Sequence, residues 1–494
     1  MQVPYIIDSF RGGISDENNR GIRGSFKFGY GLDIHKRRDS LSCLYAMSNI
    51  VDSSVTTDLI RFAVTGIDGS TYGFGDTGRI YSIAGHTTDP VDNFIVADAN
   101  GTVKGASAWT YYGAQSTAAY LVWTTNTSVA RKSLPADAGW GNEEVNFKTI
   151  LTASDWHPVK PAGGRLCIGN KENLATLDIE GSFAIDAMNI RPGNNIKAIE
   201  EKDDYVILGS EREDEAEEGH IWSWITTALN WVQKKRIPAK GVNSLVDAEL
   251  LYMQAGASGE IWSSDFVNSV PLVSVPDGGQ SNPGGSSIFD DRAVFGIYGT
   301  REDLNPGIYS YGRKMKDRPF VLGYDYRLTR NVANSIVSEI GAVWTAHNAL
   351  FASWKTTDGS TTEYGVDMVS TTTRASARYE GLEFTGGSPH LKKHFTSAKV
   401  VMEPLPSGTS VSLLWKPNRT TTGGDSSAGA GWRYARAGGG SSTTYSTADS
   451  TEAEFVINDE ARVFEIGVEL NPSGSDTPEI TAIIPYIERE TKQY

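Results

Sequence analysis

The sequence contains few of the features expected of a membrane-spanning or disulfide-linked protein. Only two of its 494 residues are cysteines, and it has no run of about 18 apolar residues that would span a membrane. Cys43 and Cys167 each lie in an apolar, strand-like run, which predicts two buried free thiols, with a disulfide as the open alternative. The amino terminus lacks the basic and apolar segments of a signal peptide. We therefore expect synthesis in a cytoplasm and no membrane span.

Positive charge is also scarce. The chain has 45 basic and 60 acidic residues, which gives a formal net charge of −15. A protein that binds nucleic acid through phosphate contacts needs a basic surface, so we expect no nucleic-acid partner. The same charge balance favours high solubility.

Motifs that carry catalysis or bind a metal are missing. The sequence has no HExxH motif, nucleophile elbow, phosphate loop or CxxC pair. His390 and His394 share one basic stretch, which favours a solvated linker over a metal pair. The acidic run Glu211–Glu218 lacks the alternation and glycine of a calcium loop, so we favour a solvated loop over a cation site. We expect no enzyme activity, no cofactor and no metal, with a propeller glycosidase as the least favoured alternative.

A short motif, in contrast, recurs seven times. Each copy is an apolar strand, a polar turn and a second strand that is often aromatic. Successive copies begin 58, 46, 39, 45, 44 and 56 residues apart. The copies are anchored on Phe62, Tyr120, Leu166, Tyr205, Leu250, Val294 and Leu350. A period of 40 to 50 residues with several short strands is typical of β-propeller blades. The sequence therefore predicts an all-β chain with a propeller of about seven blades over residues 25–385. Copies two and three are degenerate, so six or eight blades stay open.

The order of strands within a copy is regular. An inner strand such as Ile196–Glu200 precedes the apolar strand Tyr205–Gly209, and a later strand carries an Ile-(Tyr/Trp)-Ser core in four copies. The runs 26–30 and 41–47 precede the first copy. Since a terminal strand commonly completes a blade of a closed propeller from the other chain end, we assign both runs to that role.

The pattern changes around residues 381–395. Five strand-like runs then occur within about 100 residues without a 45-residue repeat, which predicts a small β-sandwich over residues 390–494. Between two of these runs lies a segment rich in Gly, Ser and Thr, residues 420–450, which we expect to be mobile. Within it, Trp432, Arg433, Tyr434 and Arg436 have the composition of a contact with a sugar or a protein partner. The alternative is that Trp432 and Tyr434 form one more strand of the sandwich.

Residues 1–24 are mostly polar and rich in Gly and Arg, which predicts an extended arm rather than a packed element. This arm is a candidate assembly element whose basic residues dock onto an acidic neighbour. The basic residues are Arg11, Arg20 and Arg23, with Lys36, Arg37 and Arg38 just beyond the arm. Three carboxylates within the arm offset these charges, so a solvated arm is an equal alternative.

Three motifs together resemble a known family. The chain begins with Phe10-Arg-Gly-Gly-Ile14 and ends with Leu405-Pro-Ser-Gly-Thr-Ser-Val411 and Thr477-Pro-Glu-Ile480. This layout is similar to that of bacteriophage tail or minor tail proteins, which carry an F-x-G-G-l start and a terminal sandwich with l-P-x-G-t-x-v and t-P-e-I strands. The resemblance covers most of the chain in layout, and it implies no catalytic residue.

The resemblance implies a structural component of a tailed virion, in the tail tip, nozzle or an appendage. Its expected partners are other virion tail proteins and further copies of the chain, and its expected location is the virion tail. The absence of a signal peptide fits this role because virions are released by lysis. The alternatives are a receptor- or glycan-binding module of the same particle, with a host surface receptor as its partner, and a cellular propeller scaffold.

Overall fold

The fold is built almost entirely from β-strands. The computed structural model describes residues 2–15, 22–35, 39–51, 56, 58–83, 95–98, 101–112, 117–134, 143–149, 151–214, 218–265, 268–299, 305–332, 337–358, 360–385, 390–425 and 427–489. Within these ranges the only helical element is the 3-10 helix η1 (Thr329–Val332), and no helix could span a membrane. The chain divides into two compact units. One holds Met1–Met47, Tyr309–Arg327 and Ser370–Tyr494, and the other holds Ser48–Ile308 and Leu328–Val369.

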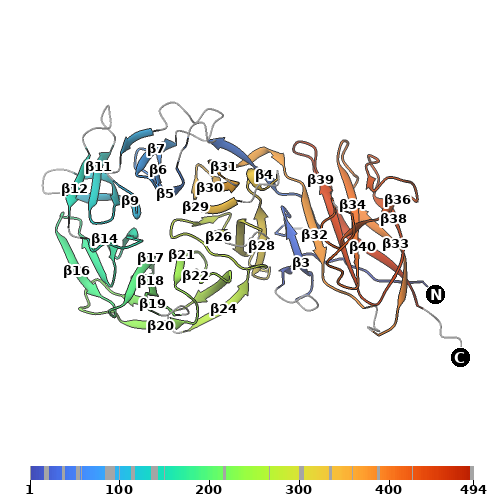
Figure 1. Cartoon of the computed structure of the whole chain (residues 1–494), viewed down its shortest axis with the longest axis horizontal. Coiled ribbons are helices and arrows are strands. Elements are labelled where there is room, and N and C mark those ends of the chain that lie inside the picture. Colours follow the sequence, from blue (N-terminus) through green and yellow to red (C-terminus); the bar gives the residue numbers. More distant parts are fainter. Residues whose placement is uncertain are drawn as a thin grey trace. The chain divides into compact units, whose positions relative to one another are not determined.

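Seven four-stranded sheets are arranged around a common centre (Figure 1). We number them as blades 1 to 7 and give their strands from the inside outward. Blade 1 is β5 (Ile60–Thr65), β6 (Thr71–Gly75), β7 (Arg79–Ile83) and β8 (Ile95–Asp98), blade 2 is β9 (Gly105–Tyr112), β10 (Thr117–Thr124), β11 (Val129–Leu134) and β12 (Glu144–Lys148), and blade 3 is β13 (Val159–Ala162), β14 (Arg165–Asn170), β15 (Asn173–Leu177) and β16 (Phe183–Asn189).

The remaining blades repeat this order. Blade 4 is β17 (Asn194–Lys202), β18 (Tyr205–Arg212), β19 (Gly219–Trp224) and β20 (Gln233–Ile237), and blade 5 is β21 (Val242–Asp247), β22 (Leu251–Ala255), β23 (Glu260–Ser264) and β24 (Ser269–Ser274). Blade 6 is β25 (Ser286–Phe289), β26 (Arg292–Ile297), β27 (Gly307–Gly312) and β28 (Val321–Tyr326), and blade 7 is β29 (Val337–Ala346), β30 (Ala349–Asp358), β31 (Thr361–Arg374) and β4 (Tyr45–Val51). The fold is therefore a seven-bladed β-propeller, as the repeats predict.

The blades are held together by apolar side chains between neighbouring sheets. One cluster packs Phe74 of blade 1 against Trp123 of blade 2. Another packs Tyr81 of blade 1 in the same core as Trp344 and Phe351 of blade 7. Because a single four-stranded sheet cannot bury its own two faces, each blade depends on its neighbours. The contact between blades 7 and 1 closes the ring.

The outer strand of blade 7 comes from the beginning of the chain. The strand β4 lies beside β31 in the sheet order, so a strand from the beginning of the chain does complete a blade. It spans Tyr45–Val51 and thus overlaps only the end of the predicted run 41–47. Asn49 of β4 donates through Nδ2 to Oδ1 of Asp367 at 3.1 Å, and the same carboxylate accepts from Thr329 and Trp354. The run 26–30 does not complete a blade. It forms β3 (Ser25–Tyr30) in the other unit.

That other unit contains a β-sandwich of two sheets. The first sheet runs in the order β1 (Gln2–Pro4), β40 (Ile480–Arg489), β33 (Lys393–Met402), β38 (Glu452–Ala461) and β36 (Arg436–Ala437). The second runs in the order β2 (Gly13–Ile14), β3, β32 (Ala377–Gly381), β39 (Phe464–Asn471), β34 (Ser410–Pro417) and β35 (Arg433–Tyr434), and β37 (Thr444–Tyr445) also pairs with β34. Segments from both chain ends therefore share each sheet.

The beginning of the chain differs from the predicted arm. In the part of residues 1–24 that the structure describes, β1 pairs with β40 and β2 pairs with β3. Phe10 is only 1% exposed and meets the ring of Tyr379 edge-on. Few apolar residues are needed here, because the strand pairing satisfies the backbone and two side chains, Phe10 and Ile14, supply the buried contacts. The sandwich unit thus includes residues before the propeller as well as those after it.

Candidate functional site: a pocket on the propeller axis

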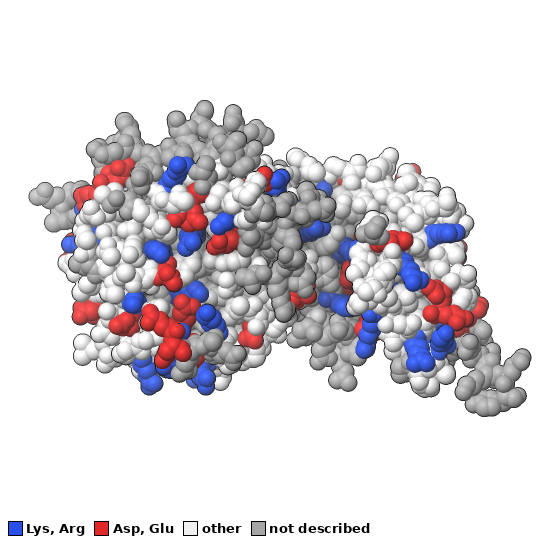
Figure 2. All heavy atoms as spheres, viewed as in Figure 1, with Lys and Arg blue, Asp and Glu red and all other residues white. Residues whose placement is uncertain are grey.

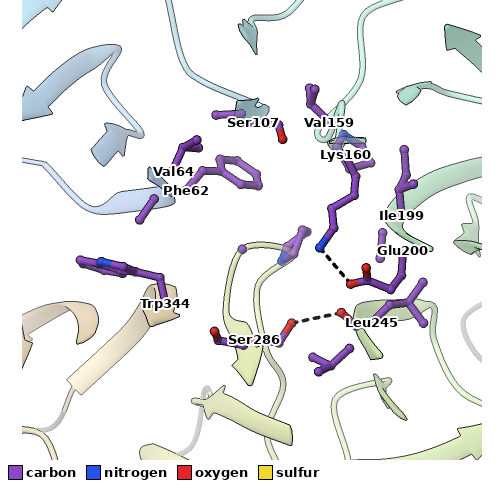
Figure 3. A pocket seen from close by; sticks show the side chains of 18 of the residues that line it. Phe62, Val64, Ser107, Val159, Lys160, Ile199, Glu200, Leu245, Ser286 and Trp344 are labelled. Carbon is purple, nitrogen blue, oxygen red and sulfur yellow. Dashed lines mark hydrogen bonds and ion pairs between the residues drawn. The ribbon is translucent and has the colours of Figure 1, made fainter. Parts of the chain in front are cut away.

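The inner strands of all seven blades line one pocket of about 530 Å³ (Figure 3). The lining residues lie in the second half of the inner strands of blades 1, 4, 5 and 7, and nearer the beginning of the inner strands of blades 2 and 3. Each blade contributes at least one side chain to the wall, and these include Phe62, Ser107, Lys160, Glu200, Leu245, Ser286 and Trp344. A site of this kind exists only once the ring has closed, because its wall combines residues from seven repeats.

The segment that precedes β25 forms part of the floor of the pocket. A Cβ atom added to Gly284 would lie 2.1 Å from the carbonyl oxygen of Arg61 in blade 1, which is not a neighbour of blade 6. The carbonyl oxygen of Gly284 accepts a hydrogen bond from Val343 N at 2.9 Å. Pro283 and Gly284 therefore reach across the axis, and glycine is required there because the backbones approach so closely.

The wall of the pocket combines apolar side chains with polar and charged groups, including an ion pair between two neighbouring blades. Lys160 Nζ lies 3.0 Å from Oε2 of Glu200, in the neighbouring blade. The lysine side chain is 45% exposed, whereas the glutamate side chain is 13% exposed. A second pair, Lys202 with Asp247 at 2.7 Å, lies where the inner strands end. Ser286 Oγ donates to the carbonyl oxygen of Leu245 at 3.5 Å. The arrangement offers apolar walls, hydroxyl groups and paired charges, which is the chemistry of binding.

The turns that follow the inner strands lie beyond the carboxyl ends of these strands and are acidic. These turns comprise residues 66–70, 163–164, 203–204, 248–250, 290–291 and 347–348 among those that the structure describes. They contain six exposed carboxylates and no lysine or arginine. We call the six residues the acidic rim: Asp68, Asp203, Asp204, Glu249, Asp290 and Asp291. On the face of the molecule that Figure 2 shows, described basic and acidic side chains are interspersed.

The predicted contact residues of the glycine-rich segment lie in the sandwich. Trp432 is 4% exposed and packs with Leu414 and Ala428, while the guanidinium group of Arg378 lies 5.4 Å from the centre of its ring. This placement matches the alternative in which the ring belongs to the sandwich. The segment 420–450 is not simply an open loop, because it holds β35, β36 and β37.

The other three residues of that group have different surroundings. The Tyr434 hydroxyl donates to Glu469 at 2.8 Å, and burial, followed by that carboxylate, raises the pKa of Tyr434 to about 12. Arg433 pairs with Asp459 at 2.8 Å and lies over the ring of Trp415. Arg436 is exposed on β36. The structure therefore does not bring these four side chains together as one exposed surface.

The basic residues proposed for assembly are only partly described. Arg11 lies 3.2 Å from Asp39, and Arg23, whose side chain is 80% exposed, lies 3.2 Å from Asp8. Both arginines thus pair with carboxylates of their own unit. Arg20, Lys36, Arg37 and Arg38 lie outside the described residues.

Three further expectations concern cysteines, histidines and the acidic run. Cys43 and Cys167 are buried and free, which confirms the prediction of free thiols. His394 lies 2.9 Å from Asn458 and 3.6 Å from Glu488, and His390 is exposed. In the described part of the acidic run, Arg212 pairs with Asp214 and Glu218.

Sequence reasoning missed the pocket. Its two central charges, Lys160 and Glu200, are 40 residues apart, and both lie in inner strands that the sequence predicts only as repeats. A usable signal is the placement of a charged residue at the same strand position in adjacent copies. The acidic rim was also visible as Asp-rich turns after the inner strands, once the inner strands are aligned.

Comparison with known proteins adds little beyond the architecture. No protein-family model matches the sequence, and no curated protein sequence matches it. Among solved structures, Raptor of Chaetomium thermophilum is similar over 66% of this chain at 12% identity and a TM-score of 0.45, and this chain spans 30% of its length. The WD40 β-propeller domain of Doa1 (11% identity, TM-score 0.43) is covered over 97% of its length by 65% of this chain. PorZ of Porphyromonas gingivalis (12% identity, TM-score 0.38) is covered over 44% of its length by 72% of this chain. The likeness is one of fold and carries no functional argument.

Proposed function

We propose that this protein is a structural component of a tailed bacteriophage virion, located in the tail tip, nozzle or an appendage, and that it acts as a scaffold for other tail proteins. The observation that carries the proposal is that all three motifs of the resemblance lie in one sandwich and have structural roles there. A motif that marks an assembly fold should consist of packing and turn residues rather than of reactive groups.

The first motif anchors the beginning of the chain. Phe10 and Ile14 are buried. A Cβ atom on Gly12 would lie 2.1 Å from Ser25 N, and Gly13 has a φ of 66° with Val321 Cβ only 2.6 Å from such an atom. Each position therefore needs either a buried apolar side chain or no side chain, which accounts for the F-x-G-G-l pattern.

The second motif forms a tight turn before β34. Thr409 donates through N and Oγ1 to the carbonyl oxygen of Pro406, at 3.2 and 2.7 Å, and Gly408 has a φ of 80°. Leu405 and Val411 are fully buried on either side of this turn. The turn thus fixes where β34 begins.

The third motif joins the two chain ends. Thr477 Oγ1 accepts from Cys43 N at 2.9 Å, Glu479 accepts from the hydroxyl of Ser40 at 2.7 Å, and Ile480 is paired with Leu41. These contacts tie the segment after β3 to the last strand. Such a sandwich presents a fixed surface to neighbouring subunits, which suits a particle component that also forms homo-oligomers.

The receptor-binding alternative in its sequence-based form required an exposed ring at Trp432. Because that ring is buried, we keep adhesion to a host surface only as a secondary proposal, carried by the axial pocket instead. No observation on the described residues favours a glycosidase.

The test is the location of the protein in intact particles. An antibody raised against the purified chain, applied to virions released from a producing host, is expected to place gold label at the tail. Antibody absorbed with the purified chain serves as the control. Label on neither tail nor appendage, in preparations whose lysate contains the protein, would show that it is not a virion component.

A further inference from the structure

We propose that the axial pocket and the acidic rim bind a basic loop of a partner protein, and that an arginine at the tip of this loop enters the pocket and pairs with Glu200 in place of Lys160. The inference concerns what the pocket binds. It does not depend on the partner being a virion protein, so it can hold or fail separately from the proposed function.

The pocket is large enough to admit the tip of a loop together with its side chain. The pocket is about 530 Å³ in volume, and the Pro283–Gly284 segment reaches across the axis at its floor. Phe62 and Ile199 supply apolar walls for the aliphatic part of a long side chain. Glu200 lies beyond these walls with its side chain only 13% exposed. An arginine packs its methylene groups along apolar surface and carries its charge at the end, so it fits both features.

The existing ion pair is suited to exchange. Lys160 is the more exposed partner, so its ammonium group can return to water when another cation arrives. Arginine binds a carboxylate through two parallel hydrogen bonds, which a lysine cannot do. The incoming cation also leaves no buried charge unpaired, which avoids the main cost of opening a partly buried ion pair.

The acidic rim supplies the charge complementarity that selects a basic partner. Its six carboxylates are exposed, and among the described residues Asp203, Asp204 and Asp291 have no ion pair with a cation. A surface of one sign raises the rate at which an oppositely charged partner arrives.

Turn geometry alone does not explain this charge. Asp203, Asp290 and Asp291 have positive φ angles, a conformation that aspartate tolerates. Yet glycine and asparagine fit the same conformation without charge, as Gly163, Gly164 and Asn348 do in blades 3 and 7. Asp204 is exposed and is not among the positive-φ residues, so a left-handed backbone does not account for its charge, whereas Asp68 accepts a hydrogen bond from Ser70 N within its own turn.

The test uses the full chain and a fluorescein-labelled peptide, acetyl-Gly-Lys-Arg-Lys-Gly-amide, followed by fluorescence anisotropy at low and high salt. Two matched peptides replace the arginine by citrulline, which is neutral and similar in shape, or by glutamate. We expect the arginine peptide to bind most tightly and the glutamate peptide least. Salt should weaken the binding of the arginine peptide.

Two substitutions in the pocket should change affinity in opposite directions. Glu200→Gln should weaken the arginine peptide on the order of tenfold, because hydrogen bonds to charged groups are the stronger class. Lys160→Met should strengthen it, because the competing cation is removed. Asp186→Asn and Lys392→Met change the net charge equally at exposed positions elsewhere and should leave the affinity within about twofold. A thermal unfolding curve for each variant checks that the fold is intact.

Several results would overturn the proposal. If Glu200→Gln and Asp186→Asn have the same effect, attraction to the acidic surface is non-specific. If Lys160→Met weakens binding, or if the glutamate peptide binds best, the pocket is a site for an anion held by Lys160. Equal binding of the arginine and citrulline peptides would show that no cation enters the pocket. Failure of the arginine peptide to bind the folded chain at low salt would have the same consequence.

Discussion

Asp58 is a buried carboxyl group that should make the propeller less stable as the pH rises. Its residue is 1% exposed, just before the inner strand of blade 1. Oδ1 accepts from Thr77 N at 2.8 Å, and Oδ2 accepts from Thr77 Oγ1 at 2.9 Å. Burial makes the largest contribution to raising the pKa of Asp58 from 3.8 to about 7, and a hydrogen bond to Asp76 and the negative charge of Asp76 add to it. The proposed perturbation is Asp58→Asn, which fixes the neutral form with nearly the same shape.

The raised pKa of Asp58 determines whether the propeller gains or loses stability as the pH rises. Since the folded state holds the proton more tightly than the unfolded state, the stabilising contribution is present below the unfolded pKa of 3.8 and is lost as the pH rises to about 7. Each unit of pKa corresponds to 1.36 kcal/mol, so a shift of roughly three units gives an upper bound of about 4 kcal/mol. The response of the protein interior to the charge reduces this bound, and we expect about 2 kcal/mol.

The assay is denaturant unfolding of the wild type and Asp58→Asn at about pH 5 and about pH 8. Unfolding is followed by tryptophan fluorescence, and the propeller transition is analysed separately from that of the sandwich. We expect the variant to gain stability over the wild type as the pH rises. Asp186→Asn, at an exposed position of blade 3, is the control for removing one negative charge. A wild type that loses no stability relative to Asp58→Asn between these pH values would refute the reasoning.

Four further changes test other parts of the structure. Gly284→Ala should destabilise the propeller by about 1–3 kcal/mol, because its Cβ meets backbone, whereas Gly440→Ala, which has room, should not; equal thermal midpoints would contradict the floor assignment. Trp432→Ala should destabilise the sandwich by about 3–5 kcal/mol in denaturant unfolding, and unchanged stability with impaired attachment to host cells would favour a receptor contact instead. Burial is the main cause, and the nearby charge of Lys234 the second, that lowers the pKa of His220 from 6.5 to about 4, so the protein should lose stability as the pH decreases from 6.5 to about 4. The stability of His220→Gln should depend less on pH in acid unfolding, and an acid unfolding profile identical to that of the wild type would argue against the lowered pKa. Deleting residues 1–24 should lower the thermal midpoint of the sandwich while the propeller transition persists, and an unchanged sandwich would show that β1 and β2 contribute little.

The propeller could be predicted because each blade repeats the same local pattern. The Ile-(Tyr/Trp)-Ser cores all fall on the third strand of a blade, for example on β7 and β19. The anchor residue of the first copy, in contrast, does not occupy the same strand position as the anchors of the other copies. Phe62 lies on an inner strand, whereas the other anchors lie on or next to second strands, and this explains the long first gap of 58 residues. The period revealed the ring, while the assignment of strand positions required the pairing itself.

The beginning of the chain and the pocket could not be predicted in the same way. Phe10 and Ile14 sit in a glycine- and arginine-rich segment whose average composition suggests an open arm. The beginning of the chain is packed by pairing of β1 with residues more than 400 positions away, such as Pro4 with Tyr486, and by the contact of Phe10 with Tyr379. The pair of Lys160 and Glu200 likewise depends on the packing of two blades. Both features arise from long-range contacts that leave no local pattern.

Different parts of the molecule therefore differ in how freely their residues can change. In the sandwich, the motif residues Phe10, Gly13 and Thr409 are fixed by burial, by a positive φ angle or by a turn hydrogen bond, so substitutions there act on stability. In the acidic rim, Asp204 is exposed and has no positive φ angle, whereas Asp68 accepts hydrogen bonds from Ser70 N at 3.1 Å and from the Tyr72 hydroxyl at 2.9 Å. The backbone does not require such a charge at Asp204. We therefore explain it by the basic partner that approaches the pocket. Loss of the Asp204 charge should consequently alter partner binding while leaving the stability of the propeller unchanged, which is the opposite of the effect expected in the sandwich.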